Sequence, residues 1–256
     1  MIFLLKLVLS DIKNLGLEEF VEVRSFEGLL VNYAKKIDAK IQLDGVLNEP
    51  IWDEAEKADD FWQIFPTDSL RATNKTVVKL LYDDAFLYVS ATAKGIGPDF
   101  RVNSLRRDFS ARSNDNVTVI FDTFKDGQNA FLFGVSAFGV QREALISDRG
   151  TQIRGFNLTW DIKWEAATTR NEDSFVIEIA IPFSSLKYPE GSQKWGFQSY
   201  RYDMQSNERS NWTNIDQNQI PMRGLRQLYL NHEIDIHKSL SYLENQYLFL
   251  LQACIK

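Results

Sequence analysis

The chain of 256 residues has a single cysteine, Cys254, and only two histidines, His232 and His237. One cysteine cannot form an intramolecular disulfide, and it excludes cysteine-based metal sites and redox pairs. Because both histidines lie near the C-terminal end, Ser-His-Asp or Cys-His catalysis has no natural place in the central region. The sequence also lacks the short motifs of serine hydrolases, zinc proteases and nucleotide-binding enzymes. These absences disfavour an enzyme.

An excess of positive charge is missing as well. The sequence has 29 Lys and Arg against 35 Asp and Glu, for a net charge of −6, and no dense basic stripe. Because binding to a phosphate backbone depends on clustered basic residues, we predict no nucleic-acid partner. No stretch approaches the roughly 20 apolar residues of a membrane-spanning helix, so we also predict no membrane span.

The two ends of the sequence differ from its middle. Residues 1–36 begin with MIFLLKLVLS, an apolar run that Lys6 interrupts and that no small-residue cleavage site follows. We interpret residues 1–36 as an N-terminal extension, either a degraded signal sequence or an added strand or helix. Residues 231–256 read as a C-terminal tail that could form an amphipathic helix.

The middle of the chain alternates between apolar and polar residues with a period of two. Apolar runs at Val77–Tyr82 and Phe86–Ala93 flank a turn-like break at Asp83–Ala85. Further strand candidates are Val117–Asp122, Phe131–Val135, Val140–Ile146, Phe175–Ile181, Trp195–Tyr202 and Leu225–Leu230. Short strands at this spacing predict an all-β fold, an antiparallel two-sheet β-sandwich of the jelly-roll kind over residues 37–230. One or two short helices are expected, at Asn48–Ala55 with Asn48 as N-cap and around Ser184–Leu186.

Acidic residues are numerous, but their spacing marks out no catalytic pair. A glycosidase needs two carboxylates that face each other across a cleft. The candidates are Asp115, Asp122, Glu143, Asp148, Asp161 and Glu165. Because turns and strand edges use such residues routinely, a hydrolase remains only an alternative.

The acidic loops favour a calcium site over a catalytic carboxylate pair, because calcium prefers carboxylate and carbonyl oxygens. Asp122 and Asp126, just before Gly127, are the candidate ligands. The alternative is that Asp126-Gly127 simply makes a hairpin turn.

The tryptophans are the candidates for a sugar-binding surface, because a sugar ring stacks its apolar face on a flat aromatic side chain. Trp52 and Trp195 lie in patterns typical of a core. Trp160 and Trp164 share one side of an extended segment, so one of them should pack inward. Trp212 lies in the polar stretch RSNWTNID, which we interpret as an exposed loop. It is therefore the main platform candidate, with a lid over the core as the alternative.

A series of motifs, in this order, resembles family 9 carbohydrate-binding modules. The motifs are Leu43-Asp44-Gly45, Asn48-Glu49 with Trp52, Leu81–Asp84, Leu87–Val89, Asn114–Asp122, Phe175–Phe183, Trp195-Gly196-Phe197 and Trp212. The resemblance covers about residues 36–230. The phrases FDTFKDGQNAFLFGVSAFGVQREALI and WDIKWEAA are most similar to a subgroup in which the module is N-terminal in long bacterial proteins associated with the outer membrane.

The resemblance implies a β-sandwich that binds the ends of glucan or xylan chains between two clamping aromatics, with a structural calcium ion. It implies attachment to glycoside hydrolases such as xylanases, and a secreted, periplasmic or cell-surface location. On this match, Trp212 falls at one clamp position and Arg142 falls near a polar ligand position. Residues 231–256 match nothing in the family, so we expect the subgroup's long downstream region to be missing.

The sequence departs from the family pattern at the second clamp position. A tryptophan is expected just before Asn114, where this chain has Phe109–Ser113, and Thr118 replaces the usual acidic residue. Phe109, Trp160 and Trp62 are the candidates for the second aromatic.

We therefore predict a binding module, not an enzyme, that targets a polysaccharide-processing or cell-envelope protein to glycan chains. The predicted sugar-binding residues are Trp212, Arg142, Trp160 and Phe109. One alternative is a structural or protein-interaction sandwich of the cell envelope whose sugar site has decayed. A second is a glycoside hydrolase-associated domain with hydrolytic activity.

Overall fold

The computed structural model describes residues 31–150, 155–215 and 225–230. The chain separates into two compact units, Met1–Val31 and Asn32–Lys256. Most of the predicted N-terminal extension and the whole predicted tail lie outside the described residues. Residues 31–36 contribute two short strands, β1 (Val31–Tyr33) and β2 (Lys35–Lys36).

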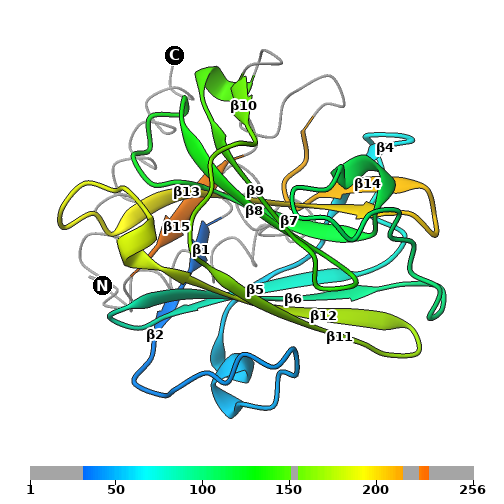
Figure 1. Ribbon diagram of the computed structural model, residues 1–256, viewed down its shortest axis with the longest axis horizontal. Helices are drawn as coiled ribbons and strands as arrows, with labels where there is room; N and C mark the ends of the chain where they lie inside the picture. Colours follow the sequence, from blue (N-terminus) through cyan, green and yellow to red (C-terminus); the bar gives the residue numbers. More distant parts are fainter. Residues whose placement is uncertain (1–30, 151–154, 216–224, 231–256) are drawn as a thin grey trace, which may run out of the picture. The chain divides into compact units, whose positions relative to one another are not determined.

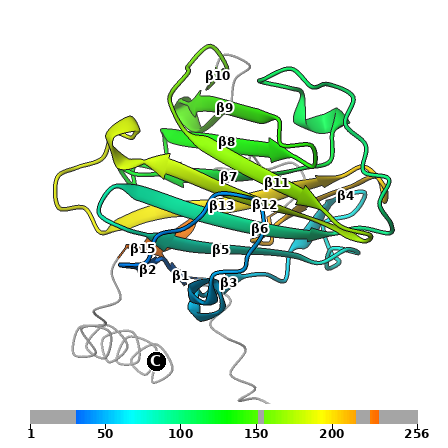
Figure 2. The same ribbon diagram turned by 60° about the horizontal axis from the view of Figure 1, so that its bottom comes forward.

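The described part of the second unit consists of two β-sheets stacked as separate layers (Figures 1 and 2). The larger sheet has the order β1-β15-β13-β7-β8-β9-β10, with β14 paired to β13 and β4 paired to β14. Its further strands are β4 (Trp62–Phe65), β7 (Asn116–Asp122), β8 (Ala130–Ser136), β9 (Gln141–Ile146), β10 (Phe156–Asn157), β13 (Lys194–Asp203), β14 (Glu208–Asn211) and β15 (Arg226–Tyr229).

The smaller sheet has the order β11-β12-β6-β5-β2, and β3 also pairs with β5. Its strands besides β2 are β3 (Lys57–Ala58), β5 (Thr76–Tyr82), β6 (Phe86–Lys94), β11 (Glu165–Arg170) and β12 (Ser174–Pro182). The pairings among strands β3 to β15 are antiparallel, whereas β2 and β5 run parallel. The predicted all-β sandwich is confirmed.

The helices are short turns of 3-10 type: η2 (Pro50–Glu54), η3 (Ala111–Ser113), η4 (Asp148–Gly150) and η6 (Phe183–Ser185). The two predicted helical turns correspond to η2 and η6. The N-cap position of η2 is occupied by Glu49, not by the predicted Asn48. None of the helices in the described ranges has the length and apolar character that a membrane span requires.

Aromatic side chains fill the space between the sheets. The inner face of the larger sheet carries Phe121, Phe133 and Phe197, and the Phe121 ring lies 6.4 Å from Phe133 and 5.5 Å from Phe197 between centroids. The predicted core residue Trp195 is buried in this layer, whereas Trp52, which is also buried, packs on the outer face of the smaller sheet with Leu81, Tyr88 and Ala180. Alternation along the strands sends every second side chain into this core, as the period-two pattern predicts.

The outer face of the larger sheet is also covered over much of its area. Ile120, Leu132 and Ile146 form a second buried apolar cluster there, against which Tyr202 packs. Strand β7 is accordingly buried along its whole length, on both faces. A simple alternation of buried and exposed positions therefore does not apply to this central strand.

Candidate functional site

A row of residues in register runs across the outer face of the larger sheet. Arg142 of β9 pairs with Gly134 of β8, Gly134 with Thr118 of β7, and Thr118 with Tyr200 of β13. Side chains at directly opposed positions point to the same face of a sheet. A Cβ atom on Gly134 would lie 2.6 Å from the Thr118 hydroxyl and 2.8 Å from Cγ of Arg142. Glycine at this position therefore lets the two polar side chains meet.

Two of the predicted sugar-binding residues, Arg142 and Phe109, lie together on this outer face. The Arg142 guanidinium donates a hydrogen bond of 3.2 Å to the Tyr200 hydroxyl and lies 5.8 Å from the centre of the Phe109 ring. Both side chains are buried, and the Nε atom of Arg142 has no hydrogen-bond partner in the described structure. This pair has the composition of a sugar-binding element, but it is covered.

Trp212 contradicts the expectation of an exposed platform. Its side chain is only 4% exposed, and its ring lies 5.3 Å from that of Phe197. Since Phe197 and Tyr200 are three positions apart on one strand, they face opposite sides of the sheet. Trp212 therefore packs into the core and does not face Arg142 or Phe109.

The polar context of Trp212 arises from a strand, not from the predicted loop. Residues Glu208–Asn211 form β14, and the Trp212 amide donates a hydrogen bond of 2.9 Å to the Ser199 carbonyl. The neighbouring Ser210, Asn211 and Thr213 are buried despite being polar.

Of the other candidate aromatics, Trp160 lies on the inner face, away from Arg142, whereas Trp62 lies two strands beyond Tyr200 in the same row of the outer face. The Trp160 ring contacts the inner-face residues Phe131 and Phe133, at 5.2 and 6.2 Å between centroids, and is partly buried. Its neighbour Trp164 is buried, as expected for one member of this pair. Trp62 begins β4, where the Arg71 guanidinium covers its ring at 3.7 Å. Within the described residues, no ring contact joins any two of Trp212, Phe109, Trp160 and Trp62.

An open pocket of about 350 Å³ lies beside the β13–β14 turn. Its lining residues come from β4, η3, β13, β14 and the connecting turn: Ile64, Phe65, Arg112, Tyr202, Asp203, Met204, Asn207, Glu208 and Arg209. Phe65 is 49% exposed, which makes it the accessible aromatic side chain of this pocket. The volume is within the range of small-molecule sites, and the combination of aromatic rings with charged groups suits a sugar.

Phe65, Arg112, Tyr202 and Arg209 are not among the site residues predicted from the sequence. A signal was available in the alternation of Tyr200 and Tyr202, which places both side chains on one face of β13. Arg209 is opposite Tyr202 in the register of β13 with β14, and Phe65 is opposite Arg209 in that of β14 with β4. The pairing with β4 joins residues far apart in the sequence, and no local pattern indicates it.

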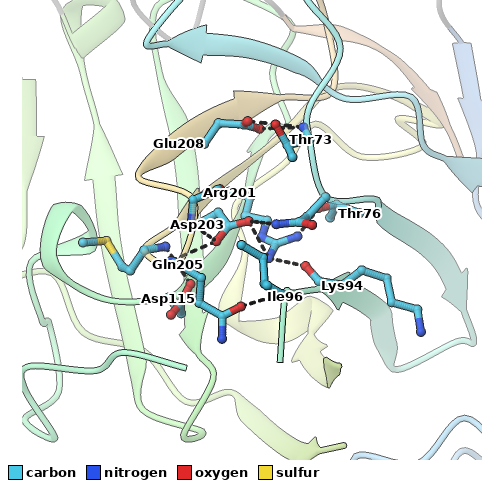
Figure 3. Close-up of polar contacts among 12 residues, drawn as sticks. Thr73, Thr76, Lys94, Ile96, Asp115, Arg201, Asp203, Gln205 and Glu208 are labelled. Atoms are coloured by element: carbon cyan, nitrogen blue, oxygen red, sulfur yellow. Dashed lines mark hydrogen bonds and ion pairs between the residues drawn. The ribbon is translucent and has the colours of Figure 1, made fainter. Parts of the chain in front are cut away.

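A buried polar network supports the turn from the core side (Figure 3). Arg201 forms an ion pair of 3.2 Å with Asp203 and donates a hydrogen bond of 3.2 Å to Thr76 of the smaller sheet. Asp115 accepts hydrogen bonds from the backbone amides of Met204, at 2.8 Å, and Arg101, at 2.6 Å. Burial raises the pKa of Asp115, although these amides act in the opposite direction. The network fixes the ends of β13 and β14.

A second group of charges lies at the far edge of the same sheet. The buried carboxylate of Glu143 and the exposed carboxylate of Asp161 both contact the Arg107 guanidinium. Burial raises the pKa of Glu143 to about 7, although Arg107 lowers it. These two carboxylates share one cation, and neither lines the pocket described above.

The predicted calcium ligands lie in the β7–β8 turn. Asp122 accepts a hydrogen bond of 2.8 Å from the Gly127 amide, and Asp126 accepts one of 2.7 Å from the Gln128 amide. Burial raises the pKa of Asp122. For Asp126, hydrogen bonds from Asn129 and Gln128 outweigh partial burial and lower the pKa. Within the described residues, no group of three or more His, Cys, Asp or Glu is arranged to hold a metal ion. Calcium therefore stays a prediction.

The sequence of the chain matches a known family. The family model described as "Carbohydrate family 9 binding domain-like" matches residues 43–220, more than half of the chain. No curated protein matches the chain in sequence.

Solved structures share the fold. A carbohydrate-binding module of family 9 from Caldicellulosiruptor kristjanssonii, in complex with glucose, has a TM-score of 0.56 at 17% identity and covers 80% of this chain and 98% of its own. The same type of module from that organism in complex with cellotriose has a TM-score of 0.54 at 17% identity, covering 80% and 96%. A proposed carbohydrate-binding protein from Bacteroides uniformis has a TM-score of 0.63 at 10% identity, covering 78% and 99%.

Proposed function

The chain belongs to the carbohydrate family 9 binding domain-like family and is a binding module, not an enzyme; on this premise we propose that it binds glucan or xylan chains in the pocket beside the β13–β14 turn. The observation that carries this placement is the composition of the pocket. Phe65 and Tyr202 offer aromatic surface, and Arg112, Arg209 and Asn207 offer polar groups around it. A sugar needs both, an apolar face for its ring and hydrogen-bonding groups for its hydroxyls.

The size of the pocket favours binding of a few sugar residues over binding of a long polysaccharide segment. A volume of about 350 Å³ is at the lower end of the range for small-molecule sites. The family modules of similar fold were solved with glucose and with cellotriose. We expect an affinity between about 1 μM and 1 mM, as for other open sites of this kind.

The biological setting is a further part of this proposal. We propose a secreted, periplasmic or cell-surface location, in which the module targets a polysaccharide-processing or cell-envelope protein to its glycan. Attachment to a glycoside hydrolase such as a xylanase, or to an outer-membrane-associated protein, fits this role. Fractionation of the native host followed by immunoblotting tests the location, and recovery of the protein only from the cytosol would contradict it.

A second candidate function is a structural or protein-interaction sandwich whose sugar site has decayed. The burial of Trp212 and Phe109 favours it, because neither expected clamp residue offers an accessible ring.

Affinity electrophoresis against soluble glucans, xylans and mannans separates the two functions. The binding function predicts that at least one glucan or xylan retards the protein in a concentration-dependent way. Unchanged mobility in every gel, with the protein shown to be folded by its melting curve, would favour the structural role.

A further inference from the structure

Two arginines line the pocket, and neither has a partner among the residues that the structure describes. Arg112 is exposed in η3 and Arg209 is partly buried in β14. Neither guanidinium has a hydrogen-bond or ion-pair partner within the described ranges, and the Nε atom of Arg209 is buried with none. A buried donor without a partner is costly, so a ligand that accepts a hydrogen bond here would gain affinity.

The acidic residues of the same pocket are already engaged by the protein. Asp203 forms its ion pair with Arg201 and accepts a hydrogen bond of 2.7 Å from Asn74. Glu208 accepts hydrogen bonds from the Gln63 amide group, at 2.7 Å, and from the Thr73 backbone amide, at 3.2 Å. Figure 3 shows the Glu208 carboxylate directed toward Thr73. Of the charged groups in the pocket, the ones left unused by the protein are therefore cationic.

The lining of the pocket holds two arginines and two carboxylates, and only the arginines lack a protein partner among the described residues. A guanidinium matches a carboxylate in shape and charge, and it binds one through two parallel hydrogen bonds. Such charge-assisted bonds are roughly twice as strong as those to a neutral hydroxyl. Phe65 and Tyr202, in the same pocket, would contact the ring that carries the carboxylate.

We propose that this pocket selects sugars that carry a carboxylate, that is, the uronic acid residues of acidic polysaccharides. The inference rests on the proposed function, since it names the class of sugar that the same pocket prefers. Arg112 and Arg209 would hold the carboxylate, and Phe65 would contact the sugar ring.

Isothermal titration calorimetry with matched ligands tests the proposal. The acidic ligands are trigalacturonate and a xylotriose that carries one glucuronosyl branch. Their neutral counterparts are the methyl ester of trigalacturonate and unbranched xylotriose, with cellotriose as a further neutral sugar. We expect each acidic ligand to bind about tenfold more tightly than its counterpart, with a preference that shrinks as salt screens the charge.

The outcomes separate the uronate preference from the proposed sugar-binding function. Equal affinity for acidic and neutral partners would overturn the uronate preference and leave the proposed function intact. Binding of no ligand at all would overturn both. Competition by sodium acetate as strong as that by trigalacturonate would overturn the proposal in favour of a general anion site.

Variants locate the effect in the pocket. We expect Arg112→Gln and Arg209→Gln each to weaken trigalacturonate binding by about tenfold and cellotriose binding by a smaller factor of about two to three, so that the preference for the acidic ligand falls. Arg106→Gln is the matched control, because Arg106 is exposed in the segment that precedes η3 and does not line the pocket. An equal loss in Arg106→Gln, or no loss in the two pocket variants, would contradict the assignment. Melting curves of all variants check that they fold.

Discussion

On the inner face of the larger sheet, aromatic rings pack against one another, whereas beside the β13–β14 turn an aromatic ring and two arginines line an open pocket. Trp212 belongs to the first region and Phe65 to the second, although Trp212 has the more polar sequence neighbours. The difference arises from strand register, which directs Trp212 toward Phe197 and places Phe65 opposite Arg209. Exposure of an aromatic residue therefore depends on its strand partners more than on its sequence neighbours.

The largest expected effect is on the core side of this comparison. Trp212→Ala should lower the free energy of unfolding by about 3 to 5 kcal/mol, because a buried indole leaves a cavity when it is removed. Chemical denaturation measures the change. This expectation reverses the one from sequence, in which Trp212→Ala removes sugar binding and costs little stability. A variant as stable as the parent protein would show that Trp212 is exposed after all.

A smaller effect is expected from Glu143, whose side chain is buried beside Arg107 and Asp161. Burial raises its folded-state pKa to about 7, above that of the unfolded chain, so folding favours the protonated form. The stability from this group is present at low pH and is lost as the pH rises through about 7. As the pH rises from about 5 to about 8, the free energy of unfolding of the Glu143→Gln variant should therefore increase by about 1 to 3 kcal/mol relative to that of the parent protein. Chemical denaturation of both proteins at the two pH values measures this difference. An equal difference in the free energy of unfolding at both pH values would contradict the prediction.

The smallest effect concerns the predicted calcium ion at Asp122 and Asp126. An ion bound only to the folded state stabilises it, so a chelator should lower the melting temperature by a few degrees and added calcium should restore it. If the two carboxylates serve the turn alone, the chelator changes nothing, while Asp126→Ala still destabilises by about 1 kcal/mol through the lost hydrogen bonds. An unchanged melting curve in chelator would contradict the predicted calcium site.

Much of the fold could be predicted from the sequence, because local alternation reports which strands border a core. The predicted runs Val77–Tyr82 and Phe86–Ala93 correspond to β5 and β6, and Trp52 and Trp195 are buried as expected. The pattern failed at β14, whose Ser210 and Asn211 are polar yet buried between β13 and β4. Burial there depends on pairing across long sequence separations, which no short window contains.

The candidate site was harder to predict for the same reason. Arg142 and Phe109, both predicted as sugar-binding residues, do lie together, but both are buried and neither lines the pocket. The pocket itself combines β4 with β14, and Gln63 and Glu208, whose hydrogen bond joins these strands, are 145 residues apart. The family match covers the segment that holds these residues without assigning their roles.

The most direct test of the central claim compares two aromatic residues of equal exposure. Phe65 and Phe124 are each 49% exposed, but only Phe65 lines the pocket. Calorimetric titration of cellotriose and xylotriose into Phe65→Ala should show binding weaker by about three- to tenfold, because the ring contact is lost. The Phe124→Ala variant should bind as the parent protein does. Parent-like binding by Phe65→Ala, in a variant with an unchanged melting curve, would place the sugar site elsewhere.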